Sequence, residues 1–226
     1  MIHLNFKEFE AILNKLKDRS WNSSRGRTIP EYLIGQWYVQ YLKYENDWNY
    51  YFHNIFLPNL ITTKDCTINI VLYESGPGGF SFPHPNYMFL SEMLDQPIYN
   101  KHMDKYINDV IRMAGITAFP PTRRGKLSVL AKQGYLIIDL LPTHGITLKN
   151  RIEIWNDEVA RKHALKKIVN SIEITKEKLG CVHLKPKYHP SAEVEHIHGK
   201  TDDQGNWVIV NDDLRKKIFP KTKKKP

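Results

Sequence analysis

Residues 66–73 read CTINIVLY, and residues 134–141 read GYLIIDLL. Both are short apolar runs rich in β-branched residues, and a turn signal follows the first directly. Such runs are typical of strands buried on both faces of a parallel sheet. Helical patterns lie between these runs, so right-handed β-α-β crossovers are expected. The two stretches therefore predict an α/β fold with a mainly parallel sheet.

Periodicity and cap residues place the other elements. Helices are expected at residues 5–17, 29–57, 86–96, 101–115, 127–133 and 156–180. Gly115 is the expected end of the fourth helix, and Asn156 or Asp157 the expected cap of the last. A third strand is expected within 181–188 and a late strand or hairpin arm within 205–212. We expect one domain over residues 1–220, followed by a basic, disordered tail at 221–226.

Composition narrows the class of protein. With 226 residues and 41% hydrophobic residues, the chain can bury a sizeable core, and no apolar run has the length of a membrane span. The first twenty residues mix charges into apolar positions, so neither export nor a membrane location is expected, and the predicted location is cytoplasmic. Cys66 and Cys181 are too few for a disulfide framework and are expected to be reduced.

The charge balance indicates the kind of partner. Thirty-three Lys and Arg against twenty-four Asp and Glu give a formal net charge of +9. An excess of this size favours a polyanion, and nucleic acid is the first candidate. Part of the excess lies in the Lys-rich tail, which is also consistent with a solubilising end.

Three polar stretches follow the predicted strands, where ligands bind in open parallel sheets. YESGPGGFSF (73–82) ends a strand with Glu74 and continues into a loop with few side chains, which would let a flat ligand approach the backbone. DLLPTHG (139–145) places Asp139 at the end of the second strand. KYHPSAEVEH (187–196) carries His189 before Pro190, which stiffens the turn. The alternative for Glu74 is an ordinary turn with an exposed acid, and the alternative for Asp139 is a role in capping the loop that follows it.

In this order, the three stretches resemble motifs of the uracil-DNA glycosylase superfamily. YESGPGG is similar to its first motif, YLIID to the strand that ends in a base-reading residue, and HPSAE to its second catalytic motif. The resemblance spans about residues 66–195. It implies a three-layer α/β/α fold with a four-stranded central sheet, a base flipped out of DNA, and hydrolysis of its N-glycosidic bond without metal or cofactor, by a protein expected to be a monomer.

The resemblance also implies residue roles. Glu74 would stabilise the cationic sugar or orient water, and His189 would hydrogen-bond the departing base. Phe80 or Phe82 would stack on a flipped base, with Ser75, Gly78 and Asp139 completing its pocket. The residues expected to contact the DNA backbone are Ser191, Arg123, Arg124, Lys126 and Lys166. Lys166 lies in a basic helix that also contains Arg161, Lys162 and Lys167.

Two departures from the superfamily pattern concern the base. Asp139 stands where uracil-specific members have Asn, and an ionised carboxylate only accepts hydrogen bonds, which favours the amine of cytosine. Gly78 stands where the most uracil-restricted members carry a Tyr that blocks a 5-substituent. The sequence therefore predicts removal of a 5-substituted cytosine, with hypermodified bacteriophage DNA as one source and phage defence as the corresponding role. An extra residue, Gly76, lies before Pro77 in the first motif.

Other functions remain open from the sequence. One is a uracil or mismatch glycosylase of DNA repair. Another is a noncatalytic nucleic-acid-binding module that uses the positive surface and aromatic side chains. A third is a metal-dependent nuclease built on Glu74, Asp139, His196 and His198, although no HExxH pattern is present.

Overall fold

The computed structural model describes residues 3–15, 31–61, 66–73, 89, 91, 94–95, 101–139, 157–190, 199–201 and 207–209. Its elements are, in chain order, α1 (Phe6–Asn14), α2 (Glu31–Tyr51), the π-helical turn η1 (Phe52–Phe56), α3 (Leu57–Asn59), β1 (Thr67–Tyr73), α4 (Lys101–Met113), α5 (Arg123–Lys132), β2 (Tyr135–Asp139), α7 (Glu158–Leu179), β3 (Lys185–Pro190), β4 (Gly199–Thr201) and β5 (Trp207–Ile209). The tail at 221–226 lies outside these residues.

The main sheet is parallel and has the strand order β2-β1-β3. Asn69 of β1 pairs with Tyr135 of β2 and with Lys187 of β3, which fixes the register of all three strands. The α/β class and the parallel sheet are therefore confirmed. The described residues contribute three strands to this sheet, so the expected fourth strand is not shown.

The central strand β1 is buried as its apolar run predicts. Ile68, Ile70 and Leu72 have no exposed surface, and Val71 is almost fully buried. Strand β2 has an outer edge, which aromatic side chains of α2 cover. Trp48 Nε1 donates to the Ile137 carbonyl at 3.0 Å, and Tyr51 Oη accepts from the Ile137 amide at 3.3 Å. Both backbone groups of Ile137 are thus satisfied, so a further strand cannot pair with β2 at this residue.

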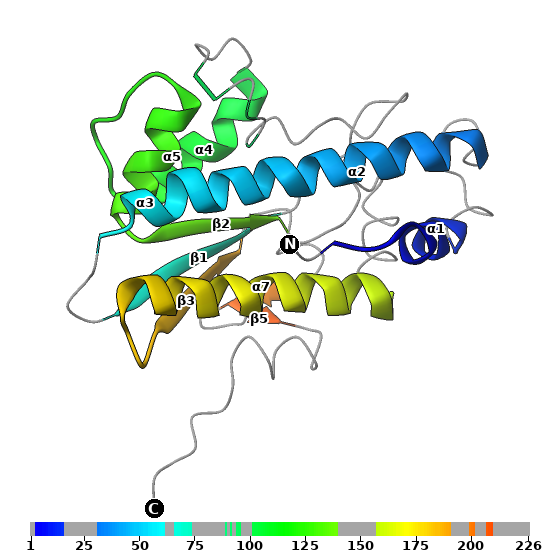
Figure 1. Ribbon diagram of the computed structural model, residues 1–226. Helices are drawn as coiled ribbons and strands as arrows, with labels where there is room; N and C mark the ends of the chain where they lie inside the picture. The colour runs from blue at the N-terminus through cyan, green and yellow to red at the C-terminus, as the bar shows by residue number, and fades with distance from the viewer. Residues whose placement is uncertain are drawn as a thin grey trace, which may run out of the picture.

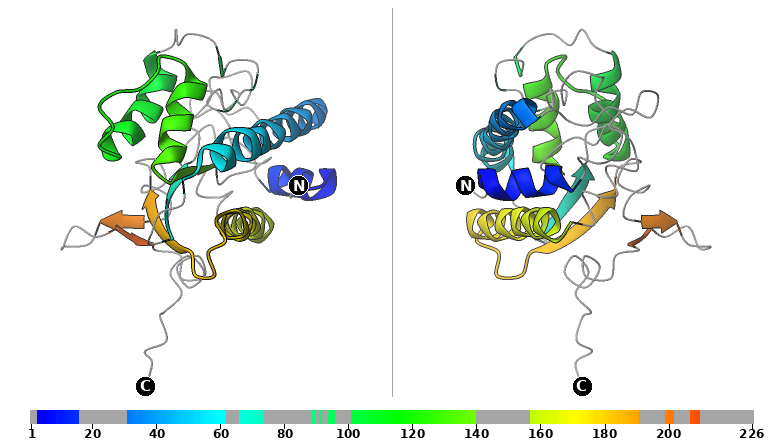
Figure 2. Two further views of the ribbon diagram at one scale, coloured as in Figure 1. Left: turned by 60° about the vertical axis from the view of Figure 1, so that its left-hand side comes forward. Right: turned by 90° about the vertical axis from the view of Figure 1, so that its right-hand side faces the viewer.

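Helices flank the sheet on both sides. Figures 1 and 2 show α7 on one side of the sheet and α4 with α5 on the other, while α1 and α2 lie near α7. Contacts agree with this view, because the Tyr73 ring packs against Tyr106 of α4 with 4.3 Å between centroids. Alternate residues of a strand point to opposite faces, so Asn69, Val71 and Tyr73 share the face that α4 covers.

The ends of the helices follow the sequence signals. Asp157 caps α7 by accepting from the amides of Val159 and Ala160, and Gly180 ends that helix in the left-handed conformation. Gly115, which lies just beyond α4, also has a positive φ of 69°. The predicted helix at 86–96 is different. Of its residues the structure describes Phe89, Ser91, Leu94 and Asp95, which lie in turns or 3₁₀ conformation and not in an α-helix.

The third strand begins later than its apolar residues suggest. Residues 181–184 are irregular, with a bend at 182–183, and β3 covers KPKYHP instead of CVHLKPKY. Pairing with β1 rather than hydrophobicity sets these limits, since Lys185 donates its amide to the Cys66 carbonyl at 2.9 Å. The late strand is confirmed as a hairpin arm, because β5 pairs antiparallel with β4 in a separate sheet.

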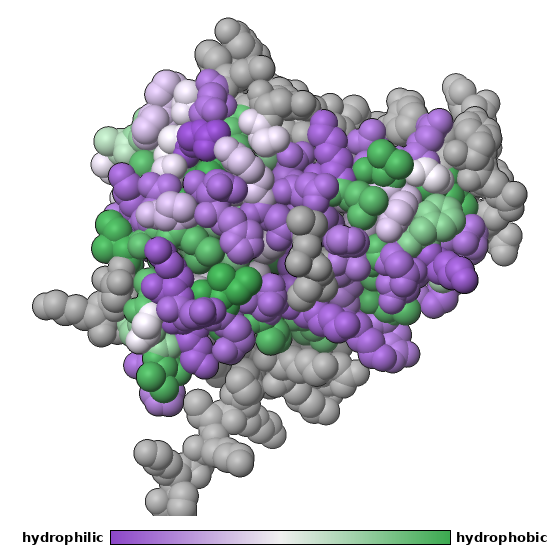
Figure 3. Space-filling model, viewed as in Figure 1, coloured by the Kyte–Doolittle hydropathy of each residue, from purple (hydrophilic) through white to green (hydrophobic). Residues whose placement is uncertain are grey.

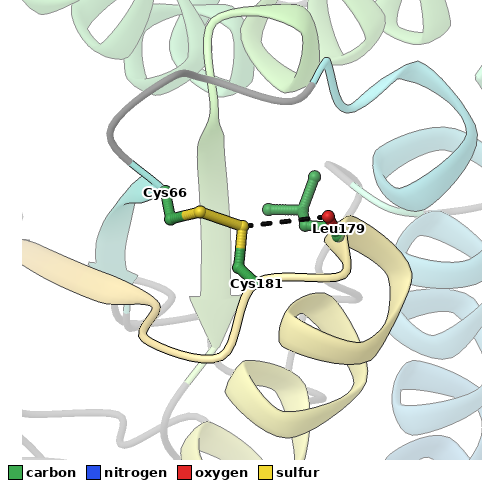
Figure 4. The surroundings of a disulfide bond; sticks show 3 residues. All are labelled: Cys66, Leu179 and Cys181. Carbon is green, nitrogen blue, oxygen red and sulfur yellow. Dashed lines mark hydrogen bonds between the residues drawn. A yellow bond between two sulfur atoms is a disulfide. The ribbon is translucent and has the colours of Figure 1, made fainter.

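The two cysteines form a disulfide, contrary to the expectation that they are reduced. Cys66 precedes β1 and Cys181 follows α7, and their Cα atoms lie 6.1 Å apart (Figure 4). A sequence separation of 115 residues hides this proximity until β3 is placed beside β1. The bond ties together the amino ends of these two strands.

A group of polar side chains is buried between α2 and α7, and we call it the helix cluster: Tyr41, Glu45, His163 and Lys167. Lys167 Nζ lies 3.0 Å from Glu45 Oε1 and 4.3 Å from the centroid of the Trp48 ring. Tyr41 Oη accepts from the Leu4 amide at 2.7 Å and lies 3.3 Å from His163 Nε2. Burial, with Lys167 and Lys166 nearby, lowers the pKa of His163 to about 3.

Candidate functional site

The carboxyl ends of the three parallel strands meet at one edge of the sheet. Tyr73, the last residue of β1, pairs with Asp139, the last residue of β2, and Leu72 pairs with Pro190 at the end of β3. Each polar stretch identified in the sequence therefore leaves the sheet at the same edge. Most of their site residues lie outside the described residues, namely Glu74, Ser75, Gly78, Phe80, Phe82 and Ser191.

Asp139 is buried at this edge, with 8% of its surface exposed. The register places it on the same sheet face as Tyr73 and Ile137. Apolar residues precede it along β2, because Leu136, Ile137 and Ile138 are fully buried. A carboxylate held at the end of a rigid strand is well placed to read a polar group of a ligand.

His189 lies within β3, whereas the sequence placed it in the loop beyond the strand. It pairs with Val71, two residues before the end of β1. Its Nε2 is 3.0 Å from Asn69 Oδ1, and its ring centroid is 6.0 Å from that of Tyr135. Burial, followed by the charge of Lys187, lowers the pKa of this imidazole.

These polar residues lie on one face of the sheet. On this face, Tyr135, Asn69 and Lys187 form one row across the strands. His189 lies in the next row, and Asp139 at the end of β2 lies in the row after that. The structure thus brings Asp139 and His189 to the same face, although no direct contact joins them. This face combines a carboxylate that accepts hydrogen bonds with an imidazole that donates or accepts them.

Sequence reasoning missed Asn69 and Tyr135. Asn69 interrupts the apolar run TINIVL at a position where a buried strand favours an apolar residue. That interruption was the available signal. Tyr135 carries no comparable signal, because an aromatic residue at the start of a strand is common.

The basic residues assigned to the DNA backbone have different environments. Arg123 and Lys126 are buried, and Lys126 Nζ donates to Asn108 Oδ1 at 2.9 Å, which argues against contact of either with phosphates. Arg124 pairs with Asp95, with 2.5 Å between Nε and Oδ1. Lys166 is exposed.

The basic helix α7 is only partly available to a polyanion. Lys167 is buried in the helix cluster, and Lys162 pairs with Glu158 at 2.7 Å. Figure 3 shows a largely hydrophilic face over α2 and α7 with small separate hydrophobic areas. Single exposed residues such as Val39 and Val169 are ordinary on a protein surface. The exposed charges, Lys166 among them, are the ones that could contact phosphate.

The described residues contain neither a metal-binding cluster nor a membrane-spanning helix. Within the described ranges, no group of three His, Cys, Asp or Glu side chains is arranged to hold a metal ion. Glu74, His196 and His198, three of the residues of the nuclease hypothesis, lie outside those ranges. None of the described helices is long and apolar enough to cross a membrane.

Comparison with protein-family models, with curated proteins and with solved structures found no match.

Proposed function

We propose that the protein is a monofunctional DNA glycosylase that removes a 5-substituted cytosine and leaves an abasic site. The observation that supports this most directly is the register of the sheet. It brings the ends of β1, β2 and β3 to one edge, and the segments that resemble glycosylase motifs lie at these three strand ends. Motifs that lay on different edges would have left no common site.

The chemistry of Asp139 supports cytosine as the base. An ionised carboxylate accepts the exocyclic amine of cytosine and repels the O4 carbonyl of uracil. As the last residue of a buried strand it has restricted movement, which would strengthen discrimination between two bases of similar shape. The sequence around Gly78 adds room at the 5-position, and a 5-substituent would distinguish the substrate from ordinary cytosine.

Glycosidic bond cleavage requires stabilisation of opposite charges on the two fragments. The sugar gains positive charge at C1′ and the departing base gains negative charge, so a carboxylate and a hydrogen-bond donor are needed on the two sides of the bond. Glu74 is proposed for the sugar or its attacking water. His189 is proposed as the hydrogen-bond donor to the base. It lies in β3, on the sheet face that also carries Asp139.

Duplexes with one modified base each test the proposal. The protein is incubated with duplexes containing uracil, cytosine, 5-methylcytosine, 5-hydroxymethylcytosine or glucosylated 5-hydroxymethylcytosine, and abasic sites are detected by alkaline cleavage. We expect cleavage of a 5-substituted cytosine duplex, unaffected by a chelator. Cleavage of the uracil duplex alone would contradict the Asp139 argument. If every duplex remained intact while still binding the protein, the noncatalytic module would be favoured.

An isosteric substitution sharpens this test. Asp139→Asn replaces an acceptor by a group that can donate to O4, so excision of the cytosine derivative should fall and excision of uracil should rise. Glu74→Gln and His189→Gln should each reduce excision by about 10² to 10³. Exposed Lys166→Gln serves as the control and should weaken only salt-dependent binding. If Asp139→Asn retained the full excision rate and the same base preference, Asp139 would not be part of the base pocket.

A further inference from the structure

Asn69 is a polar residue in the middle of the central strand. It lies between Tyr135 and Lys187 in the register and is half-buried on the face that α4 covers. A buried amide is costly unless its polar atoms are hydrogen-bonded. The Oδ1 atom of Asn69 meets this requirement through Nε2 of His189 at 3.0 Å. Two strands are therefore joined by a side-chain bond at the residue proposed to act on the base.

This hydrogen bond determines which imidazole nitrogen carries a proton. An amide oxygen only accepts, so Nε2 of His189 must donate. A neutral imidazole has a single N–H group, and its other nitrogen, Nδ1, is then a bare acceptor. The described residues supply no second hydrogen bond to this ring. Nδ1 is thus the nitrogen that remains for a substrate, and it can donate only in the imidazolium.

The groups that face His189 set how readily it becomes an imidazolium. Partial burial of the ring and, to a lesser extent, the charge of Lys187 on β3 disfavour the cation, so the pKa of His189 is lowered. Tyr135 on β2 presents an uncharged ring at 6.0 Å, and Asn69 on β1 is neutral. Asp139 is the only carboxylate in the three strands and lies on the same face at the far end of β2.

We infer that Asn69 is a positioning residue that engages Nε2–H of His189, leaves Nδ1 for the substrate, and thereby makes His189 a donor to the departing base only when doubly protonated. This inference rests on the proposed glycosylase function. Excision should then increase as the pH falls through the pKa of His189. A negative charge in place of the amide should favour the imidazolium and extend activity to higher pH.

Imidazole NMR spectra test the proton assignment without any assay of activity. In the wild-type protein at neutral pH, nitrogen shifts and couplings of His189 should show the proton on Nε2. Asn69→Asp should raise the pKa of His189 by about one to two units. Asn69→Leu removes the acceptor and should leave both neutral tautomers populated. Asn170→Asp, the same kind of change on the exposed face of α7, is the control and should leave His189 unchanged.

The pH profile of base excision tests the positioning role. In the wild type, the excision rate should decrease as the pH rises. In Asn69→Asp, this decrease should occur at a pH about one to two units higher. Asn69→Leu should lose about tenfold to a hundredfold in rate at the optimum, because the ring is no longer held. An unmoved profile in folded Asn69→Asp, or a wild-type proton on Nδ1, would overturn the inference.

The two proposals fail in different ways. If the wild type excises no base while the imidazole spectra respond as expected, the glycosylase proposal fails and the Asn69–His189 assignment stands. If excision occurs but rises with increasing pH, the neutral imidazole is the active form. The positioning inference is then wrong and the glycosylase proposal stands. The wild-type spectrum and profile require no variant, so a substitution that fails to fold leaves both tests in place.

Discussion

The pKa values of His163 and His189 are both lowered, although the two side chains lie in different regions of the molecule. His163 belongs to the helix cluster, where 4% of its surface is exposed and its Nε2 lies 3.3 Å from Tyr41 Oη. His189 is half-buried on the face of the sheet and has Asn69 as its hydrogen-bond partner. Burial is the largest cause of the lowered pKa in both.

A perturbed pKa alone therefore does not mark a functional residue. In the helix cluster, Glu45 and Lys167 compensate each other, and the surrounding helices exclude substrate. On the sheet, His189 is on the same face as Asp139, toward the edge where ligands bind in parallel sheets. The helix cluster should therefore affect stability, whereas the sheet face should affect chemistry. Four measurements test this division.

Breaking the helix cluster should have the largest effect on stability. Lys167→Met leaves the Glu45 carboxylate buried without its partner and should lower the free energy of unfolding by about 3 to 5 kcal/mol, measured by urea denaturation. Lys166→Met, the neighbouring exposed lysine, should change it by less than about 0.5 kcal/mol. If Glu45→Leu combined with Lys167→Met recovers most of the loss, the cost lies in the unpaired charge. Equal losses in the two lysine variants would refute a structural role for the cluster.

Removing the disulfide should have the next largest effect, and it acts on the strand that carries His189. Cys66→Ser with Cys181→Ser should lower the free energy of unfolding by about 2 to 4 kcal/mol, because the unfolded chain regains the freedom of a long loop. Reductant should destabilise the wild type by a similar amount and leave the double variant unaffected. A wild type with two titratable thiols after purification without reductant would contradict the disulfide.

Acid should destabilise the protein through His163. The imidazole of His163 binds a proton near pH 6.5 in the unfolded chain and only near pH 3 in the folded chain. Its contribution to the free energy of unfolding is therefore complete above pH 6.5 and is lost as the pH falls. At pH 5 the loss should be about 2 kcal/mol. His163→Gln should remove this part of the pH dependence in denaturation at pH 7 and pH 5. If the free energy of unfolding differs between pH 7 and pH 5 by the same amount in the variant, groups other than His163 cause the difference.

His189→Gln should have the smallest effect on stability. One partly buried hydrogen bond is lost or replaced, which corresponds to about 1 kcal/mol or less. Base excision should nevertheless fall by about 10² to 10³ under the proposed function. A large loss of stability with little loss of excision would place His189 with His163 as a structural residue.

Much of the fold could be predicted because it depends on local patterns. Strands β1 and β2 follow from apolar runs, and the limits of α7 follow from Asp157 and Gly180. Strand β3 was placed too early because its residues KPKYHP are held by pairing with β1 and carry no apolar pattern. The helix at 86–96 was wrong where the structure describes it. There, Phe89 packs on Tyr51 and Ser91 binds Asp47, so tertiary contacts outweigh helical propensity.

The position of Asp139 in the sheet could be predicted, whereas the surroundings of the other proposed site residues could not. Strand ends identify Asp139, since polar residues after buried runs lie at the carboxyl edge. Burial of Arg123 and Lys126 was not predictable, because a basic sequence does not reveal which side chains meet a partner such as Asn108. The Cys66–Cys181 and Asn69–His189 pairs join residues more than a hundred positions apart, and no local pattern encodes them.

The strand order β2-β1-β3 has a consequence for synthesis on the ribosome. The central strand emerges first, yet both of its neighbours are translated later. Cys181 follows Cys66 by 115 residues, which corresponds to a wait of about 6 to 23 s at ordinary elongation rates. Strand β1 has two open edges until β2 has been translated within this interval, and the edge that pairs with β3 stays open until the end of it. Chaperone demand in the cell should therefore arise from this segment before the polypeptide is complete.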